Sequence, residues 1–231
     1  MDIKTKIVGF VYARLDSTRF PNKALSKIGD KRLIDIVMDR AKSTNLDKIV
    51  LLTSDRVCDD HLANSVTERG YEVIRGSASD VVDRTVYALE CTGADIFARI
   101  NGDSPLQDKN LINFAIKHAK LDRLTSNVFV RKYPYGISAE LIGKTIYHKY
   151  HQKCFESELE HVTKHLYRLV EDSEKISIEG SVNQADYECT VDTVDQLTKL
   201  QRLMKYSAWD VNYNTILQLN ENKPVVKYYD V

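Results

Sequence analysis

Short apolar runs alternate with amphipathic stretches through the first half of the chain. Runs at residues 7–12, 48–53, 71–74 and 95–100 predict buried strands, because they are brief and rich in β-forming residues. Between and after them, apolar residues at helical spacing predict helices over 32–43, 59–69, 80–91 and 109–120. This order predicts an α/β fold with a mostly parallel sheet and ligands at the carboxyl ends of its strands.

The pattern is less regular after residue 121. It predicts strands at 124–130, 175–179 and 187–191, and helices at 143–153, 156–170 and 194–204. Pro134 and Gly136 interrupt the regular pattern between them. We expect one domain over residues 1–231, with a less regular arm at about 130–185. The ending at 225–231 fits a last strand or a packing tail equally well.

Composition restricts the classes of protein that the chain fits. Its 231 residues include 33 basic and 33 acidic side chains, and this balance argues against a nucleic-acid binder with a strongly positive surface. No apolar run has the length of a membrane span, and the first residues lack the apolar core of a signal peptide. The four cysteines are scattered, as expected for free thiols in a reducing cytoplasm.

The first predicted strand leads into a strongly polar loop. Within a few residues the chain delivers Arg14, Ser17, Thr18, Arg19 and Lys23. Fixed cations, hydroxyls and free backbone N–H groups after a strand suit a polyanion such as a triphosphate. An exposed basic loop is the plainer interpretation, and residue content alone does not choose between the two.

Two aspartates are candidate magnesium ligands. Asp103 follows a predicted strand in N-G-D-S-P, and Asp192 leaves another in T-V-D-T-V-D. Mg²⁺ is commonly held by one or two carboxylates together with substrate phosphates. Each residue alone is better explained locally, Asp103 as a turn residue and Asp192 by helix capping. Together with the basic loop they form a coherent set for metal-assisted phosphoryl transfer.

Other motifs fail. Only Gly9 stands where a dinucleotide fingerprint needs three glycines, and the stretch Gly143-Lys144-Thr145 lacks the earlier glycine of a P-loop. His161 and His165 are four residues apart on a predicted helix, but they belong to no complete zinc-ligand set. No G-x-S-x-G motif supports a serine triad.

Six stretches in order resemble the cytidylyltransferase family, which includes CMP-3-deoxy-manno-octulosonate synthetases, acylneuraminate cytidylyltransferases and spore-coat polysaccharide proteins of the SpsF type. The stretches are A-R-L-D-S-T-R-F-P-N-K from residue 13, R-G-S-A-S-D-V-V-D-R from 75, R-I-N-G-D-S-P-L from 99, Y-P-Y-G from 133, E-H-V-T from 160 and T-V-D-T-V-D-Q-L from 190. They extend over most of the chain, and the SpsF-type branch is the most similar.

The resemblance implies a three-layer α/β/α Rossmann-like nucleotide-diphosphosugar transferase fold. It also implies an enzyme that couples CTP to a sugar acid, releasing pyrophosphate and leaving a CMP-sugar for cell-surface polysaccharide biosynthesis. The expected enzyme is cytoplasmic and uses Mg²⁺. It is expected to be a homodimer through the arm, with no nucleic-acid or membrane partner.

By position, the resemblance assigns roles to individual residues. The expected catalytic residues are Arg14, Lys23, Asp103 and Asp192, the two aspartates being the Mg²⁺ ligands. The expected CTP-binding residues are Val11, Ala13, Arg14, Ser17, Arg19, Lys23, Arg75, Arg84, Asn101 and Asp103. On the sugar side the expected residues are Tyr135, Gly136, Glu140 and His161.

Three positions depart from the family pattern. It leads us to expect glycine at Asn22, an aspartate near Ser138 and an apolar residue at Gln107. Two other functions remain open: a glycosyltransferase that uses a finished nucleotide sugar, and a relative that binds nucleotide without catalysis. The absence of D-x-D after residue 100 argues against the first, and the retained basic and acidic residues argue against the second.

Overall fold

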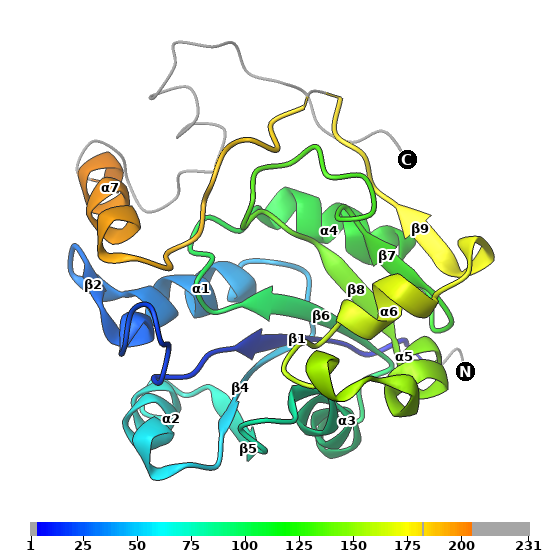
Figure 1. Cartoon of the computed structure of the whole chain (residues 1–231), viewed down its shortest axis with the longest axis horizontal. Helices are drawn as coiled ribbons and strands as arrows, with labels where there is room; N and C mark the ends of the chain where they lie inside the picture. Colours follow the sequence, from blue (N-terminus) through cyan, green and yellow to red (C-terminus); the bar gives the residue numbers. More distant parts are fainter. Residues whose placement is uncertain (1–3, 182, 205–231) are drawn as a thin grey trace.

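The computed structural model describes residues 4–181 and 183–204 (Figure 1). A seven-stranded sheet runs in the order β5-β4-β1-β6-β8-β7-β9. Its strands are β1 (Ile7–Tyr12), β4 (Lys48–Ser54), β5 (Glu72–Gly76), β6 (Ile96–Asn101), β7 (Leu124–Ser126), β8 (Glu140–Gly143) and β9 (Lys175–Ser177). The first four in space are parallel, whereas β8 runs antiparallel to both neighbours. The expected mostly parallel sheet is confirmed.

Helices cover both faces of the sheet and complete three layers (Figure 1). One face carries α1 (Leu33–Lys42), α2 (Asp60–Thr67) and α4 (Lys109–His118), and the other carries α3 (Val81–Thr92), α5 (Lys144–Tyr150) and α6 (Lys164–Leu169). A short hairpin, β2 (Lys27–Ile28) with β3 (Lys31–Arg32), lies beside α7 (Val194–Met204). None of the described helices is long and apolar enough to cross a bilayer.

Alternating side chains of the central strands build the two interfaces. In β1, Val8 and Phe10 point to the α3 side, and Val11 points to the α1 side. On the α3 side, Phe10 stacks on Phe97 at 5.3 Å between ring centroids, and Phe97 meets Tyr147 edge-on at 5.1 Å. Both faces of β1 are therefore buried, as its continuous apolar run predicts.

Helices α3 and α4 begin within one residue of their predicted starts, whereas the helices predicted over 59–69 and 109–120 end early, at Thr67 and His118. The Asp80 side chain accepts from the Asp83 amide, and Asp108 accepts from the Asn110 and Leu111 amides. Gly93 ends α3 in the left-handed region with φ 62°. The capping residues thus place α3 and α4 directly after the turns that face the site.

The predictions for the second half need correction. The helix predicted over 156–170 is wrong, because only Lys164–Leu169 is α-helical after a 3₁₀ turn at Glu156–Glu158. The strand predicted at 124–130 ends at Ser126, and the one at 187–191 is reduced to a single bridge, Glu188 with Tyr135. The prediction had no strand at 140–143, where β8 lies in the sheet. The ending at 225–231 lies outside the described residues.

The predicted arm at 130–185 also contributes to the main layers. Its β8 and β9 belong to the seven-stranded sheet, and its α5 and α6 pack on the α3 side. Tyr147 and Tyr150 are buried in this core. Much of the apolar content of the arm is therefore used within a single chain.

Candidate active site

Three distant segments meet at the carboxyl ends of β1 and β6. The Gly102 amide donates to the Tyr12 carbonyl at 2.9 Å, and the Val191 amide donates to the Asp103 carbonyl at 2.8 Å. A Cβ on Gly102 would lie 2.7 Å from the Ala13 Cβ, so a glycine is required for this approach. These contacts bring the loops after β1 and β6 against the segment before α7.

Lys23 lies between the two candidate metal ligands. Its Nζ is 2.8 Å from Asp103 Oδ2 and 2.6 Å from Asp192 Oδ1, and Arg19 Nη2 is 3.1 Å from Asp192 Oδ2. Burial lowers the pKa of Lys23, but the two carboxylates outweigh this effect and hold the pKa above its ordinary value. The space between the aspartates therefore stabilises a positive charge.

The basic loop lines a cavity of about 410 Å³, which we call the basic cavity. Its lining includes Ala13, Arg14, Ser17, Thr18, Arg19, Lys23, Arg84, Asn101, Asp103 and Asp192. Most of the expected CTP-binding residues therefore lie together. Val11, whose backbone the resemblance assigns to the cytosine, does not line the cavity, and its side chain is buried in the core.

Two arginines expected to bind CTP differ in position. Arg84 lines the basic cavity and is 4% exposed. Its Nη1 donates to the Ser77 carbonyl at 3.1 Å, its Nε has no hydrogen-bond partner, and burial lowers its pKa. Arg75 does not line the basic cavity. Its guanidinium donates to the Ser54 and Arg56 carbonyls and to the Asp60 carboxylate instead.

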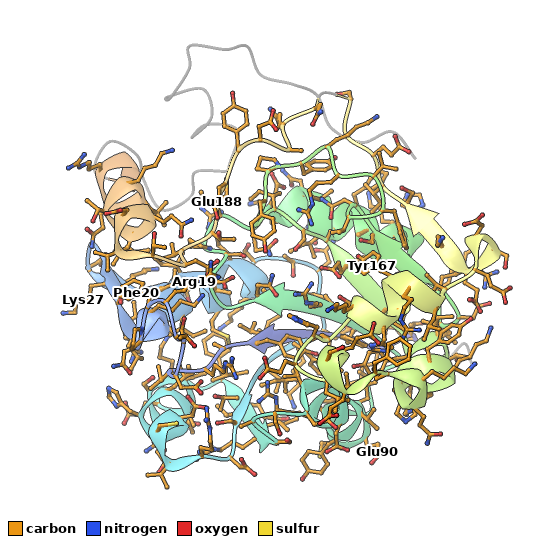
Figure 2. The ribbon with its side chains drawn as sticks, viewed as in Figure 1. Arg19, Phe20, Lys27, Glu90, Tyr167 and Glu188 are labelled. Carbon is orange, nitrogen blue, oxygen red and sulfur yellow. The ribbon has the colours of Figure 1, made fainter. Side chains whose placement is uncertain are left out.

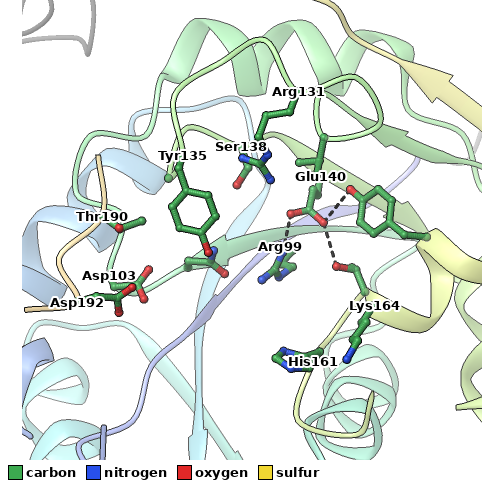
Figure 3. Close-up of a pocket in the computed structure, with 15 residues that line it drawn as sticks. Arg99, Asp103, Arg131, Tyr135, Ser138, Glu140, His161, Lys164, Thr190 and Asp192 are labelled. Carbon is green, nitrogen blue, oxygen red and sulfur yellow. Dashed lines mark hydrogen bonds and ion pairs between the residues drawn. The ribbon is translucent and has the colours of Figure 1, made fainter. Parts of the chain in front are cut away.

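A second cavity of about 410 Å³, which we call the acceptor cavity, extends towards β8 and α6 (Figure 3). It contains all four residues expected on the sugar side: Tyr135, Gly136, Glu140 and His161. Arg19 in the basic cavity and Tyr167 in the acceptor cavity lie well apart in Figure 2.

Glu140 is the most highly connected group of the acceptor cavity. It is 2% exposed and accepts from Arg99 Nη1 at 2.6 Å, Thr163 Oγ1 at 3.0 Å and Tyr167 Oη at 3.1 Å. Burial lowers the pKa of Arg99, but the charge of Glu140 more than offsets this and raises it. Figure 3 shows this network at the centre of the cavity, with Asp103 and Asp192 together at one end. Arg99 and Glu140 form an ion pair on the wall of the cavity, and their charges neutralise each other.

The two cavities join at a shared set of residues. These residues are Arg99, Asn101, Asp103, His161 and Asp192. A molecule in one cavity can therefore contact a molecule in the other beside the two aspartates. This geometry fits a reaction between two bound ligands.

The donor set at the junction fits Mg²⁺. Among the described residues no group of three or more His, Cys, Asp or Glu side chains gathers to hold a metal. Asp103 and Asp192 are two oxygen donors around a position that already attracts the Lys23 ammonium. Magnesium sites with one or two carboxylates take their remaining ligands from water and substrate phosphates.

His161 and His165 are separated by the break before α6. His161 is exposed and lines both cavities. His165 is fully buried against Tyr147, with ring centroids 5.6 Å apart and no hydrogen-bond partner on either ring nitrogen. The spacing of the two histidines is therefore not that of a metal motif.

Several cavity residues were not among the expected site residues. Arg99 had a signal in the sequence, since an arginine in an otherwise apolar strand is rarely buried without a partner. Arg131 and Lys164 had none, because they lie in segments that become neighbours only through β8 and α6. Tertiary contacts alone place these two cations in the acceptor cavity.

The three departures have different structural consequences. Asn22 has φ 59°, the left-handed conformation that explains why glycine was expected. Gln107 is 3% exposed and neither atom of its side-chain amide has a hydrogen-bond partner, as expected of a position suited to an apolar side chain. Ser138 lines the acceptor cavity.

Fold and site together define an α/β protein with a basic anion loop and paired carboxylates at the carboxyl edge of its sheet. The profile of the cytidylyltransferase family matches residues 8–207. The chain belongs to this family of nucleotidyltransferases, which confirms the resemblance seen in the sequence.

Individual relatives agree with this membership. The chain is 32% identical over 145 residues to the spore coat polysaccharide biosynthesis protein SpsF of Bacillus subtilis, a match covering 61% of this chain and 60% of that protein. The chain thus spans less than two thirds of that relative. Its fold is similar to a cytidylyltransferase from Leptospira borgpetersenii, with TM-score 0.89, 23% identity and 95% of both chains covered.

A second solved structure is similar over most of the chain. It is a CMP:2-keto-3-deoxy-manno-octonic acid synthetase complexed with CTP, with TM-score 0.65 and 19% identity. The match covers 87% of this chain and 99% of that one. At these identities both structures show a shared fold and no more.

Proposed function

We propose that this protein transfers a cytidylyl group from CTP to a hydroxyl of a sugar acid, releasing pyrophosphate and forming a CMP-sugar. The observation that carries the proposal is the junction of the two cavities, where Lys23 lies between Asp103 and Asp192. One cavity has the cations for a triphosphate, and the other provides space for an acceptor beside the same carboxylates.

The nucleotide half of the proposal is supported by the basic cavity. Arg14, Arg19 and Lys23 bring three cations to one loop, and Ser17 and Thr18 add hydroxyl donors. Several charge-assisted hydrogen bonds from one loop suit a triphosphate better than a single phosphate. Membership of the cytidylyltransferase family supports cytosine as the base.

The proposed reaction is an in-line displacement at the α-phosphorus. The acceptor hydroxyl oxygen forms a bond to phosphorus while the bond from phosphorus to the bridging oxygen breaks, and pyrophosphate leaves. Arg14 and Lys23 stabilise the charge that grows on the phosphoryl and leaving oxygens. Asp192, at the cavity junction, is the group we assign to take the hydroxyl proton. Mg²⁺ held by Asp103 and Asp192 would supply further neutralisation of phosphate charge.

The acceptor cavity favours an anionic substrate. Arg131 and Lys164 line it, and neither forms an ion pair with a carboxylate anywhere in residues 4–181 or 183–204. Glu140 is already neutralised by Arg99. Arg131 lies over the Tyr135 ring at 5.2 Å. A carboxylate on the acceptor would give Arg131 and Lys164 an anionic partner, which supports a sugar acid over a neutral sugar.

Pyrophosphate release tests the proposal. The protein is incubated with Mg²⁺, each of the four nucleoside triphosphates and a panel of sugar acids and neutral sugars. We expect release with CTP and a sugar acid, and none after chelation of Mg²⁺. Release that prefers another triphosphate would overturn the cytidylyl assignment, and release only with neutral sugars would overturn the acceptor class.

The remaining expectations are kept as proposals. We propose Mg²⁺ as the metal, a homodimer as the assembly, the cytoplasm as the location and polysaccharide biosynthesis as the process. The last is supported by the similarity to the spore coat polysaccharide protein.

A further inference from the structure

The basic loop is held near its start by a carboxylate outside the loop. The Leu15 amide donates to Asp59 Oδ1 at 2.7 Å, and the Leu15 carbonyl accepts from the Asn22 amide at 2.8 Å. Asp59 is fully buried, and its second oxygen accepts from the Ser54 hydroxyl. The Leu15 amide is therefore tied to the connection between β4 and α2, and its carbonyl is tied to Asn22 at the far end of the loop.

Asp59 does not perform the local role that its position suggests. It occupies the N-cap of α2, where an aspartate side chain normally accepts from the helix amides. Here the side chain makes no capping hydrogen bond and reaches Leu15 and Ser54 instead. Burial of a carboxylate requires compensating hydrogen bonds, and the basic loop supplies one of them.

Arg75 supports the same connection from β5. Its Nε donates to the Ser54 carbonyl at 2.9 Å, its Nη2 to the Arg56 carbonyl at 2.8 Å and its Nη1 to Asp60 Oδ1 at 2.6 Å. These bonds join β5 to the connection between β4 and α2, the segment that contains Asp59. Arg75 thus acts on the loop through this segment.

A second link runs from the same segment to a loop cation. Arg56 forms an ion pair with Asp16, and Asp16 Oδ1 lies 3.3 Å from Arg14 Nε. Arg14 lines the basic cavity, whereas Arg56 does not. The β4–α2 connection therefore touches the loop at both Leu15 and Asp16, on either side of one peptide bond.

We propose that Asp59 is a positioning residue that holds the basic loop in the shape that binds a triphosphate, with Arg75 supporting it from behind. The inference rests on the proposed function, since it concerns how that site binds its anion. A triphosphate gains most from donors that are already in place, because no further ordering has to be supplied on binding. A loosened loop keeps its cations but loses their arrangement.

Binding of inorganic tripolyphosphate and of CTP, measured by calorimetry with Mg²⁺ below the melting temperature of each variant, tests this role. We expect Asp59→Ala to weaken both about tenfold, as for loss of preorganisation. Asp59→Asn keeps an oxygen for the Leu15 amide and a donor for Ser54, so its binding should stay close to that of the wild type.

Glu174→Ala is the matched control. Glu174 is also buried and accepts from one amide, that of Glu171 at 3.0 Å, and from one hydroxyl, that of Tyr150 at 2.7 Å, and it forms an additional ion pair with Lys149. It precedes β9, at the far edge of the sheet from β4 and β5. Its loss should lower stability and leave both affinities unchanged.

Wild-type affinity in Asp59→Ala would overturn the inference, and so would equal weakening in Glu174→Ala. If Asp59→Ala does not fold, Arg75→Ala decides, with weaker tripolyphosphate binding expected and unchanged binding contradicting the inference. If the wild type binds tripolyphosphate as tightly as CTP, the proposed function is refuted. The comparison of wild type with the Asp59 variants in tripolyphosphate binding still decides this inference. A wild type that binds neither would refute both.

Discussion

Lys23 occupies the position where the charges of the site are balanced. Its ammonium contacts both aspartates, and the Arg19 guanidinium adds a second cation at Asp192, so two positive charges face the two carboxylates. In the proposed reaction the two aspartates would hold the divalent metal, and Lys23 would contact the phosphates of the nucleotide. Three residues from three separate segments thus form one electrostatic unit.

Asparagine substitutions separate turnover from folding at this unit. Asp103→Asn and Asp192→Asn each keep the size and much of the local hydrogen bonding, so melting temperatures should change little. Each should remove turnover, because a metal ligand is lost where charge grows during transfer. Arg14→Ala should weaken CTP binding as well as turnover.

Melting curves and pyrophosphate-release kinetics on these three variants provide the measurement. Normal turnover in either folded aspartate variant would exclude that residue from the metal site. A lowered melting temperature with unchanged activity per folded molecule would assign the aspartate to turn stability alone.

His165 predicts a dependence of stability on pH. Burial lowers its pKa from 6.5 to about 4, since the imidazole has no hydrogen-bond partner and lies against Tyr147. The unfolded chain therefore binds the proton more tightly. The stability is complete above pH 6.5 and is lost as the pH falls towards 4. From pH 7 to pH 5 this one group should remove about 2 kcal/mol of unfolding free energy.

Urea unfolding of wild type and His165→Leu at both pH values isolates this contribution. The variant should lose about 2 kcal/mol less than the wild type over the same interval. Parallel losses in the two proteins would show that His165 is not the group responsible.

At the scale of elements, the parallel half of the fold was predictable from local patterns. The runs that form β1, β4 and β6 are apolar on both faces, and Asp80, Asp108 and Gly93 mark helix ends. Because these strands are parallel, their carboxyl ends meet at one edge. The sequence therefore predicts that the basic loop and Asp103 lie together at this edge.

The second half depends on contacts that no local pattern contains. The apolar spacing over 156–170 suits a helix, but the Leu159 carbonyl accepts from the Val81 amide at 2.8 Å, at the start of α3. The Thr163 hydroxyl meanwhile bonds to Glu140 on β8. These long-range bonds replace helical ones, and the resulting break exposes His161 to both cavities.

Asn22, at the far end of the basic loop, has a backbone conformation that affects the start of the next element. Asn22 is exposed and left-handed, just before the 3₁₀ turn Lys23–Leu25. Asn22→Ala should cost about 1 kcal/mol of unfolding free energy, since a Cβ without a local polar partner disfavours this region. Asn22→Gly should be neutral or slightly stabilising. Denaturant titration compares them, and equal stability of the two variants would contradict the account.

At the scale of the whole molecule, the homodimer stays a prediction. Tyr147 and Tyr150 pack into the chain's own core, so they do not require a partner. Phe155 is 59% exposed and lies under the Arg168 guanidinium at 4.0 Å. Light scattering at micromolar concentration should give twice the mass of the 26.5 kDa chain, and a strictly monomeric mass would contradict the prediction.

We propose that this fold brings a triphosphate-binding loop and an acceptor cavity together around Asp103 and Asp192 for use with CTP. The nucleotide half of this proposal can be measured without knowing the sugar, by thermal shift with Mg²⁺ and each nucleoside triphosphate. We predict the largest shift with CTP, which at a hundred times its dissociation constant adds about 2.7 kcal/mol. Equal shifts with CTP, UTP, ATP and GTP would contradict the account.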